Sequence, residues 1–141
     1  MRTVATVTAL LFAFAACGRE EHDHEHDGEE EAHEHEEHAA EHGGDLVEFG
    51  NHEGHLEVKI DHDTGTMTVW VYDGEMKALA LDSAPVLNFT AGGAPKQIEG
   101  KGKGSEWTFT DDALKGEPEN VRFKLVAGGR PYTPSWEHAH D

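Results

Sequence analysis

Histidine is concentrated in a short acidic stretch near the N-terminus of the chain. Residues 19–42 contain seven histidines and twelve Asp or Glu residues, but no large apolar side chain. The seven histidines are His22, His24, His26, His33, His35, His38 and His42. Imidazole is a ligand for zinc, copper and nickel, so the ligand type alone does not choose among these metals. A His-rich tract of this kind predicts binding of transition metal ions.

The spacing of these histidines offers two ligand geometries. In an extended chain, side chains two residues apart share a face, so the alternating histidines of residues 22–26 could bind metal in pairs. In a helix, His35, His38 and His42 would lie on one stripe with Glu31. Three imidazoles and a carboxylate could then approach a tetrahedral zinc set. Metal must displace protons from imidazole, so binding should weaken at acid pH. The alternative is that the stretch is only a charged, solvated spacer.

Four more histidines are candidate ligands outside this stretch. They are His52, His55, His138 and His140. The first two precede or begin the first clearly alternating segment, and the last two form a C-terminal His-Ala-His. If the first and last strands are neighbours, the two pairs could meet, with a glutamate at position 53 or 137 nearby. The alternative is that all four are exposed polar residues at strand ends.

The first sixteen residues have the pattern of an export signal. Arg2 provides a positive start, and the apolar run of residues 3–16 ends in small side chains. This run is shorter than the roughly 20 residues that a membrane-spanning helix needs. Residues 1–16 are therefore predicted to be a signal peptide that is removed.

The residues that follow this run resemble the lipobox of bacterial lipoproteins, in the form Phe14-Ala15-Ala16-Cys17-Gly18. The resemblance implies cleavage before Cys17 and acylation of its thiol, which would anchor the chain to a lipid membrane. No other cysteine is present, so there is no disulfide framework. The alternative is an ordinary secretory signal with a chance cysteine. Gly18 is not the Asp that often retains lipoproteins at the inner membrane, which favours the periplasmic face of the outer membrane.

Charge narrows the possible partners of the mature chain. Without residues 1–16 it has 10 basic and 29 acidic side chains, a net charge of −19 with neutral histidine. Nucleic acid binding needs clustered Lys and Arg and is not expected. Cations are the natural ligands of such a surface. Motifs for a nucleophile elbow, a zinc protease or a phosphate-binding loop are absent from the sequence, so no enzymatic activity is expected.

Beyond Gly44 the sequence alternates between apolar and polar residues in short segments separated by turns. Expected strands include residues 55–61, 66–73, 76–81, 85–90, 96–99, 106–110 and 121–125, and an edge segment at 130–136. His62-Asp63-Thr64-Gly65 is expected to be a turn, and residues 112–115 a helical turn. The pattern predicts an all-β, antiparallel, Ig-like β-sandwich of seven or eight short strands behind a disordered His/Glu-rich tether.

Four segments are therefore expected along the chain. They are a signal peptide (1–16), the lipidated Cys17 with its tether (17–44), the β-sandwich domain (45–137) and a His-containing tail (138–141).

The domain resembles a group of small His-rich bacterial envelope lipoproteins. The similarity lies in Gly54-His55-Leu56-Glu57-Val58, in Asp63-Thr64-Gly65-Thr66-Met67-Thr68-Val69 and in a Tyr72-Asp73 turn. Similar modules accompany heavy-metal efflux adaptors, so the resemblance implies a sandwich in a metal-handling context and no catalytic residue. The resulting hypothesis is a lipid-anchored protein that buffers zinc, copper or nickel or delivers it to a metal efflux or uptake complex. The alternative is a protein-interaction module whose tether is only a spacer.

Overall fold

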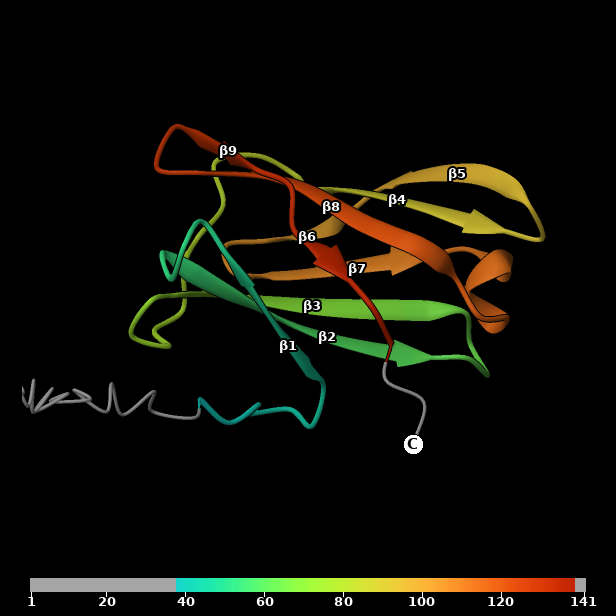
Figure 1. The fold of residues 1–141 in the computed structure, drawn as a ribbon, viewed down its shortest axis with the longest axis horizontal. Helices are drawn as coiled ribbons and strands as arrows, with labels where there is room; N and C mark the ends of the chain where they lie inside the picture. The colour runs from blue at the N-terminus through green and yellow to red at the C-terminus, as the bar shows by residue number, and fades with distance from the viewer. Residues whose placement is uncertain (1–37, 139–141) are drawn as a thin grey trace, which may run out of the picture. The chain divides into compact units, whose positions relative to one another are not determined.

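A computed structural model describes residues 38–138, and the elements named below belong to that range (Figure 1). The strands are β1 (Asp45–Phe49), β2 (Gly54–Asp61), β3 (Thr66–Asp73), β4 (Val86–Ala91), β5 (Ala94–Glu99), β6 (Lys101–Lys103), β7 (Glu106–Thr110), β8 (Glu119–Ala127), β9 (Arg130–Tyr132) and β10 (Ser135–Trp136), with a 3-10 turn η1 (Asp112–Lys115). Cys17, the histidines from His22 to His35 and His140 lie outside this range. Within it, no helix is long and apolar enough to span a membrane.

The strands form two antiparallel sheets. Sheet A has the order β1-β2-β3-β7-β6; sheet B has the order β10-β8-β4-β5, with β9 also paired to β8. The predicted all-β antiparallel sandwich is confirmed. The described residues contain ten strands rather than seven or eight. The additional strands are mostly short edge segments, such as Lys101–Lys103 in β6, which have no apolar alternation that a sequence could reveal.

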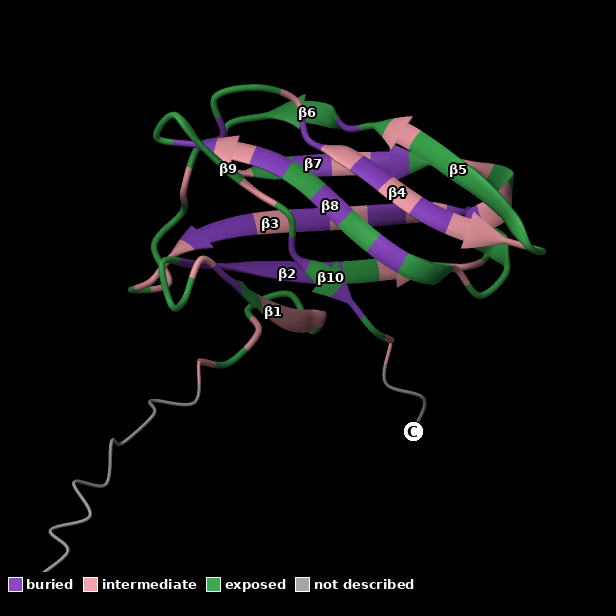
Figure 2. Cartoon of the chain, turned by 45° about the horizontal axis from the view of Figure 1, so that its top comes forward, coloured by how far each residue is buried: buried purple, intermediate pink, exposed green. Residues whose placement is uncertain are grey.

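The core lies between the two sheets because apolar side chains alternate along the central strands. Figure 2 shows this alternation as buried and exposed bands along β8. The buried apolar side chains of β2, β3, β4 and β8 that form this core include Leu56, Val58, Met67, Val69, Val71, Leu87, Phe89, Val121, Phe123 and Leu125. Burial of each such side chain contributes about 1.5–3 kcal/mol to folding. The same alternation points His55, Glu57 and Lys59 of β2 to the outer face of sheet A.

The expected strand at residues 76–81 is instead a crossing segment between the sheets. The Asp73 carboxylate accepts hydrogen bonds from the N–H groups of Glu75 and Lys77, both at 2.9 Å, and closes a turn. Beyond the turn, the segment makes a single β-bridge, between Tyr72 and Ala78. The Leu81 N–H donates to the Gly104 carbonyl oxygen in the β6–β7 turn of sheet A. The next N–H, that of Asp82, donates to the Val126 carbonyl oxygen of β8, so the chain passes here from sheet A to sheet B.

The first and last strands lie at the same edge of the sandwich. β1 is the edge of sheet A and β10 the edge of sheet B, and the Trp136 indole N–H donates to the Asp45 carboxylate at 2.9 Å. Asp45 is opposite Val58 in the β1–β2 register, near the end of β2 that leads into the His62 turn. His138, which follows β10, therefore lies close to the β2–β3 turn, with its ring centroid 6.2 Å from that of His62.

Candidate metal centre

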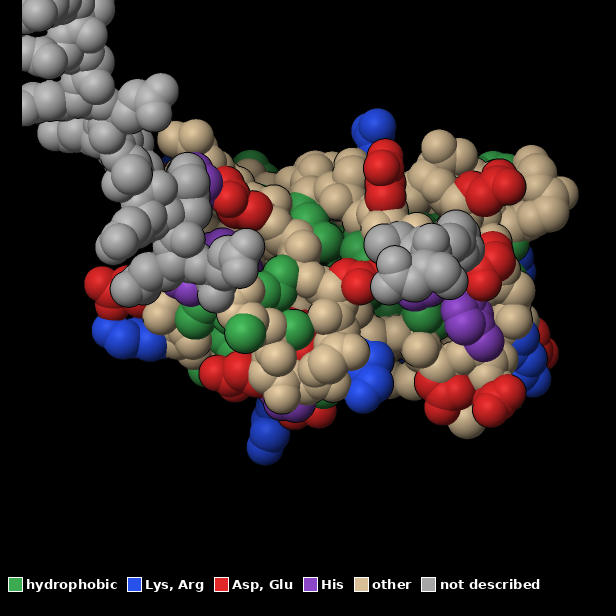
Figure 3. All heavy atoms as spheres, turned by 60° about the horizontal axis from the view of Figure 1, so that its bottom comes forward, with side chains coloured by type: hydrophobic (Ala, Val, Ile, Leu, Met, Phe, Trp, Pro, Cys, Tyr) green, Lys and Arg blue, Asp and Glu red, His purple; other side chains and the backbone are tan. Residues whose placement is uncertain are grey.

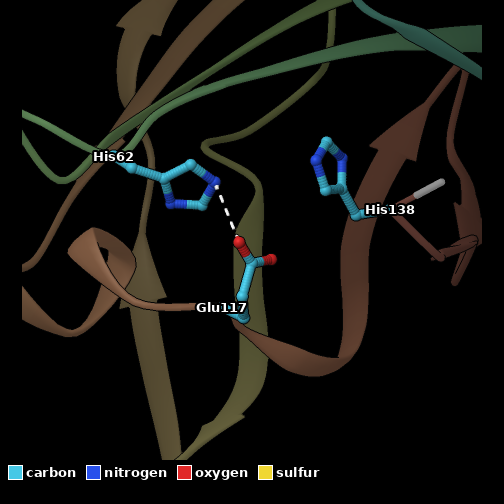
Figure 4. A group of neighbouring side chains, drawn as sticks. All are labelled: His62, Glu117 and His138. Atoms are coloured by element: carbon cyan, nitrogen blue, oxygen red, sulfur yellow. Dashed lines mark ion pairs between the residues drawn. The ribbon is translucent and has the colours of Figure 1, made fainter. Parts of the chain in front are cut away.

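Three side chains from distant parts of the sequence meet at this end of the sandwich (Figure 4). His62 comes from the β2–β3 turn, Glu117 from the segment between η1 and β8, and His138 from the residues after β10. Their potential ligand atoms all lie within 4.8 Å of one another. His62 Nε2 is 3.6 Å from Glu117 Oε1. Two imidazoles and one carboxylate therefore converge at a partly exposed position.

The turn that carries His62 is held by the side chain of Asp61. Its carboxylate accepts hydrogen bonds from the N–H groups of Asp63 at 3.0 Å and Thr64 at 3.3 Å. Hydrogen bonds from Thr64 hold the pKa of the Asp61 carboxyl below its ordinary range. Gly65 closes the turn with φ of +67°, a conformation that favours glycine. A Cβ at this position would lie 2.6 Å from the Asp111 carbonyl oxygen, so the turn packs directly against the start of η1.

The 3-10 turn η1 positions Glu117. Asp111 caps η1 by accepting a hydrogen bond from the Ala113 N–H at 2.8 Å. Leu114 is fully buried and fixes the turn to the core. The chain leaves η1 at Gly116, and Glu117 follows immediately. The glutamate is thus placed by a capped, anchored turn, while its own side chain stays exposed.

Both histidines are oriented through Nδ1. His62 Nδ1 lies 3.0 Å from the Leu114 carbonyl oxygen, which can only accept, so Nδ1 carries the proton. His138 Nδ1 lies 3.2 Å from the Asp45 carboxylate. In the neutral form of each ring the lone pair then belongs to Nε2, which is the tautomer that binds metal through Nε2. Histidines that ligate metals almost always make such a bond to a carbonyl or carboxylate through the other nitrogen.

The donor set suits a borderline transition metal. Two histidines and one glutamate are a known zinc ligand set that leaves a further position open. Ligands bound to one zinc at about 2.0–2.1 Å lie about 3.3 Å apart, so the three groups would close by roughly 1 Å around the ion. Glu117 is the most exposed of the three, with 57% of its side chain accessible, and can make this adjustment.

Only one residue of this centre, His138, was among the predicted ligands. The predicted meeting of His138 with His52 or His55 does not occur in the described structure. Strand β1 places Asp45, the partner of His138, opposite Val58, whereas Phe49 and the nearby His52 and His55 belong to the other end of β2. Figure 3 shows histidine side chains towards both ends of the face it presents.

The other predicted ligands inside the described range make different contacts. His52 pairs with Glu48 at 2.8 Å. His55 is buried, with Nδ1 3.4 Å from the Asp73 carbonyl oxygen, and its ring lies 4.9 Å from that of His38. His42 stacks on Trp70. His38, His42 and His55 therefore lie over the outer face of sheet A, whereas His52 lies in the loop between β1 and β2.

His62 and Glu117 were missed for different reasons. His62 was recognised as a turn residue, and its place immediately after an alternating strand was a usable signal. Glu117 is one of 29 acidic residues and has no distinguishing local pattern. Its role depends on the path of η1 alone.

No protein-family model, curated protein or solved structure matches the chain. The functional argument is therefore built on the side chains of this chain.

Proposed function

We propose that this chain is a lipid-anchored envelope protein that binds a transition metal ion at His62, Glu117 and His138. It would buffer zinc, copper or nickel, or deliver the ion to metal transport or efflux machinery in the envelope. The observation that carries the proposal is the orientation of both imidazoles by Nδ1 acceptors, with a carboxylate between them. Zinc and copper suit this mixed nitrogen and oxygen set.

The accessibility of the ligands favours exchange of the ion over permanent storage. About a third of each histidine side chain and more than half of the glutamate side chain are exposed. Structural zinc sites are closed by four protein ligands, whereas this centre offers three. An incoming ligand from a partner could therefore occupy the remaining position before the ion leaves.

The N-terminal part of the chain completes the proposal. Acylated Cys17 would hold the protein at the periplasmic face of the outer membrane, and the histidines of the tether that precede His42 would collect ions. The mature charge of −19 raises the local concentration of cations around the chain. No catalytic residue is required, because capture and release are ligand exchange.

Zinc titration by calorimetry tests the proposal on the full mature chain. Replacing His22, His24, His26, His33 and His35 by Asn gives a tether-silenced chain, from which the five most N-terminal candidate ligands are removed. We expect one zinc equivalent at about pH 7.5 and much weaker binding at about pH 5.5, on either side of the ordinary imidazole pKa. His138→Ala or His62→Ala should weaken binding at least about tenfold.

His52→Ala is the matched control, because His52 is an exposed histidine at the other end of β2. It should leave the affinity unchanged. If His62→Ala and His138→Ala bind zinc as tightly as the tether-silenced parent, the centre is not a metal site. The protein would then be better described as an interaction module.

A further inference from the structure

The C-terminal end of the His-rich stretch is bound to the outer face of sheet A. Glu57 of β2 has a fully buried side chain. Its carboxylate accepts hydrogen bonds from the backbone N–H groups of Glu41 at 3.0 Å, His42 at 2.6 Å and Gly44 at 3.0 Å. We call this arrangement the Glu57 clamp and residues 41–44 the clamped segment. Three donors from four residues hold the clamped segment against β2.

The ring of His42 is held by the same clamp. Its Nδ1 lies 3.0 Å from Glu57 Oε2, and its plane stacks on Trp70 with the ring centroids 4.0 Å apart and 3° between the planes. The Tyr72 hydroxyl donates to the same carboxylate oxygen at 3.1 Å. Lys59 Nζ donates to the His42 carbonyl oxygen at 2.9 Å. Both the ring and the backbone of His42 are therefore occupied.

The clamped segment ends beside the metal centre. Gly43 and Gly44 line a cavity of about 170 Å³ together with Asp45, Trp136 and His138. Asp45 itself bonds the His138 ring. Three residues of extended chain span about 10 Å, so His42 is within reach of the centre if residues 43 and 44 change direction. Gly43 has φ of +70° and no atom within 4 Å of a Cβ position, which leaves room for such a rotation.

We infer that His42 is a fourth ligand of the His62, Glu117 and His138 centre, and that the Glu57 clamp holds it away from the ion. The inference rests on the proposed function of that centre. In the clamped arrangement the centre has three protein ligands and an open position. In the released arrangement His42 swings about Gly43 and occupies that position. The clamp is thus a gate between weaker and tighter binding.

Metal binding and clamp release must then be coupled in both directions. An ion that binds the released arrangement better draws the equilibrium towards that arrangement. By reciprocity, a variant with a weaker clamp binds the ion more tightly. Coupling between two such states is commonly about 5- to 150-fold in affinity. A substitution that weakens the clamp should therefore change the measured affinity for the metal ion.

The experiment is a mutant cycle in the tether-silenced chain, with zinc affinity as the readout. Glu57→Gln removes the charge of the clamp, and Trp70→Ala removes the stacking surface without altering a buried acid. Either change should tighten zinc binding at least about fivefold. Adding His42→Ala to either variant should cancel the gain. Glu99→Gln, an exposed glutamate in β5, is the control and should have no effect.

Hydrogen exchange of the backbone amides gives an independent readout. The amides of Glu41, His42 and Gly44 are bonded to Glu57, so saturating zinc should accelerate their exchange in the tether-silenced chain. Unchanged or slower exchange would contradict the hypothesis that the clamp controls His42. A gain in zinc affinity that persists in the His42→Ala variants would also contradict it. If zinc binding fails already in the tether-silenced parent, the proposed function fails. If it depends on His138 while the clamp variants leave it unaltered, only the gate fails.

Discussion

Two histidine–carboxylate pairs beside β2 serve different purposes. His42 Nδ1 lies 3.0 Å from the carboxylate of Glu57 in β2, and His138 Nδ1 lies 3.2 Å from that of Asp45, which is opposite Val58 in the β1–β2 register. Glu57 is fully buried and takes three backbone donors as well, whereas 41% of the Asp45 side chain is exposed. The His42 ring is stacked on Trp70, while the His138 ring shares its surroundings with His62 and Glu117.

The difference shows that burial decides what a histidine–carboxylate pair does. A buried carboxylate surrounded by donors fixes a chain segment, because breaking its bonds would leave a charge without partners. In the proposed function, the more exposed Asp45 carboxylate orients the His138 ring for binding of an ion through Nε2. The comparison therefore predicts large effects on stability at the clamp and effects on metal affinity at the centre.

The largest effect on stability is expected for Glu57→Ala. The change removes an acceptor from the N–H groups of Glu41, His42 and Gly44 and from the Tyr72 hydroxyl, so the free energy of unfolding should fall by about 3 kcal/mol. Urea denaturation of the mature protein measures it. Glu99→Ala should change the same quantity by less than about 0.5 kcal/mol, as is usual at exposed positions. Similar values for the two variants would mean that the clamp contributes nothing to folding.

A smaller loss of stability is expected for an alanine at Gly44 than for Glu57→Ala, and a still smaller one for an alanine at Gly43. A Cβ on Gly44 would lie 2.5 Å from the Val58 carbonyl oxygen, so Gly44→Ala should cost about 2 kcal/mol and expose the amides of the clamped segment to exchange. Gly43→Ala meets no neighbouring atom and should cost only the roughly 1 kcal/mol of a non-glycine residue at positive φ. Thermal melts combined with hydrogen exchange measure both. Equal exchange in the two variants would contradict the role of Gly44 in the clamp.

The smallest expected effect is a change in the acid limb of the stability curve. Burial raises the pKa of Glu57, but hydrogen bonds from Gly44, His42 and Tyr72 lower it by more, so it lies below its ordinary range. The unfolded chain then binds more protons, and the stabilisation by ionised Glu57 is lost as the pH falls from about 4.3 through the lowered pKa. Glu57→Gln should flatten this limb. Unfolding free energies at several pH values between about 5 and 3 measure the slope, and parallel curves would argue against an ionised Glu57 in the clamp.

Much of the fold was determined by local sequence pattern. Alternation in residues 55–61, 66–73, 106–110 and 121–125 fixed which side chains enter the core, because a strand in a two-layer sandwich must bury one face. The turn at His62-Asp63-Thr64-Gly65 was equally readable, because Gly65 adopts a positive φ there and the preceding Asp61 accepts hydrogen bonds from its backbone. The strand expected at residues 76–81 was wrong for a physical reason: an apolar pattern does not reveal that the chain is crossing between sheets.

The composition of the His-rich stretch predicted metal ligands, but the location of a preformed centre required the tertiary structure. His62, Glu117 and His138 are separated by 55 and 21 residues along the chain and meet only because β1 and β10 form the same edge of the sandwich. The Glu57 clamp could not be predicted from the sequence either, because the alternating pattern predicts that a glutamate at this position is exposed. Only packing shows that the clamped segment covers it, because burial of a charge depends on which distant chain segment supplies the donors.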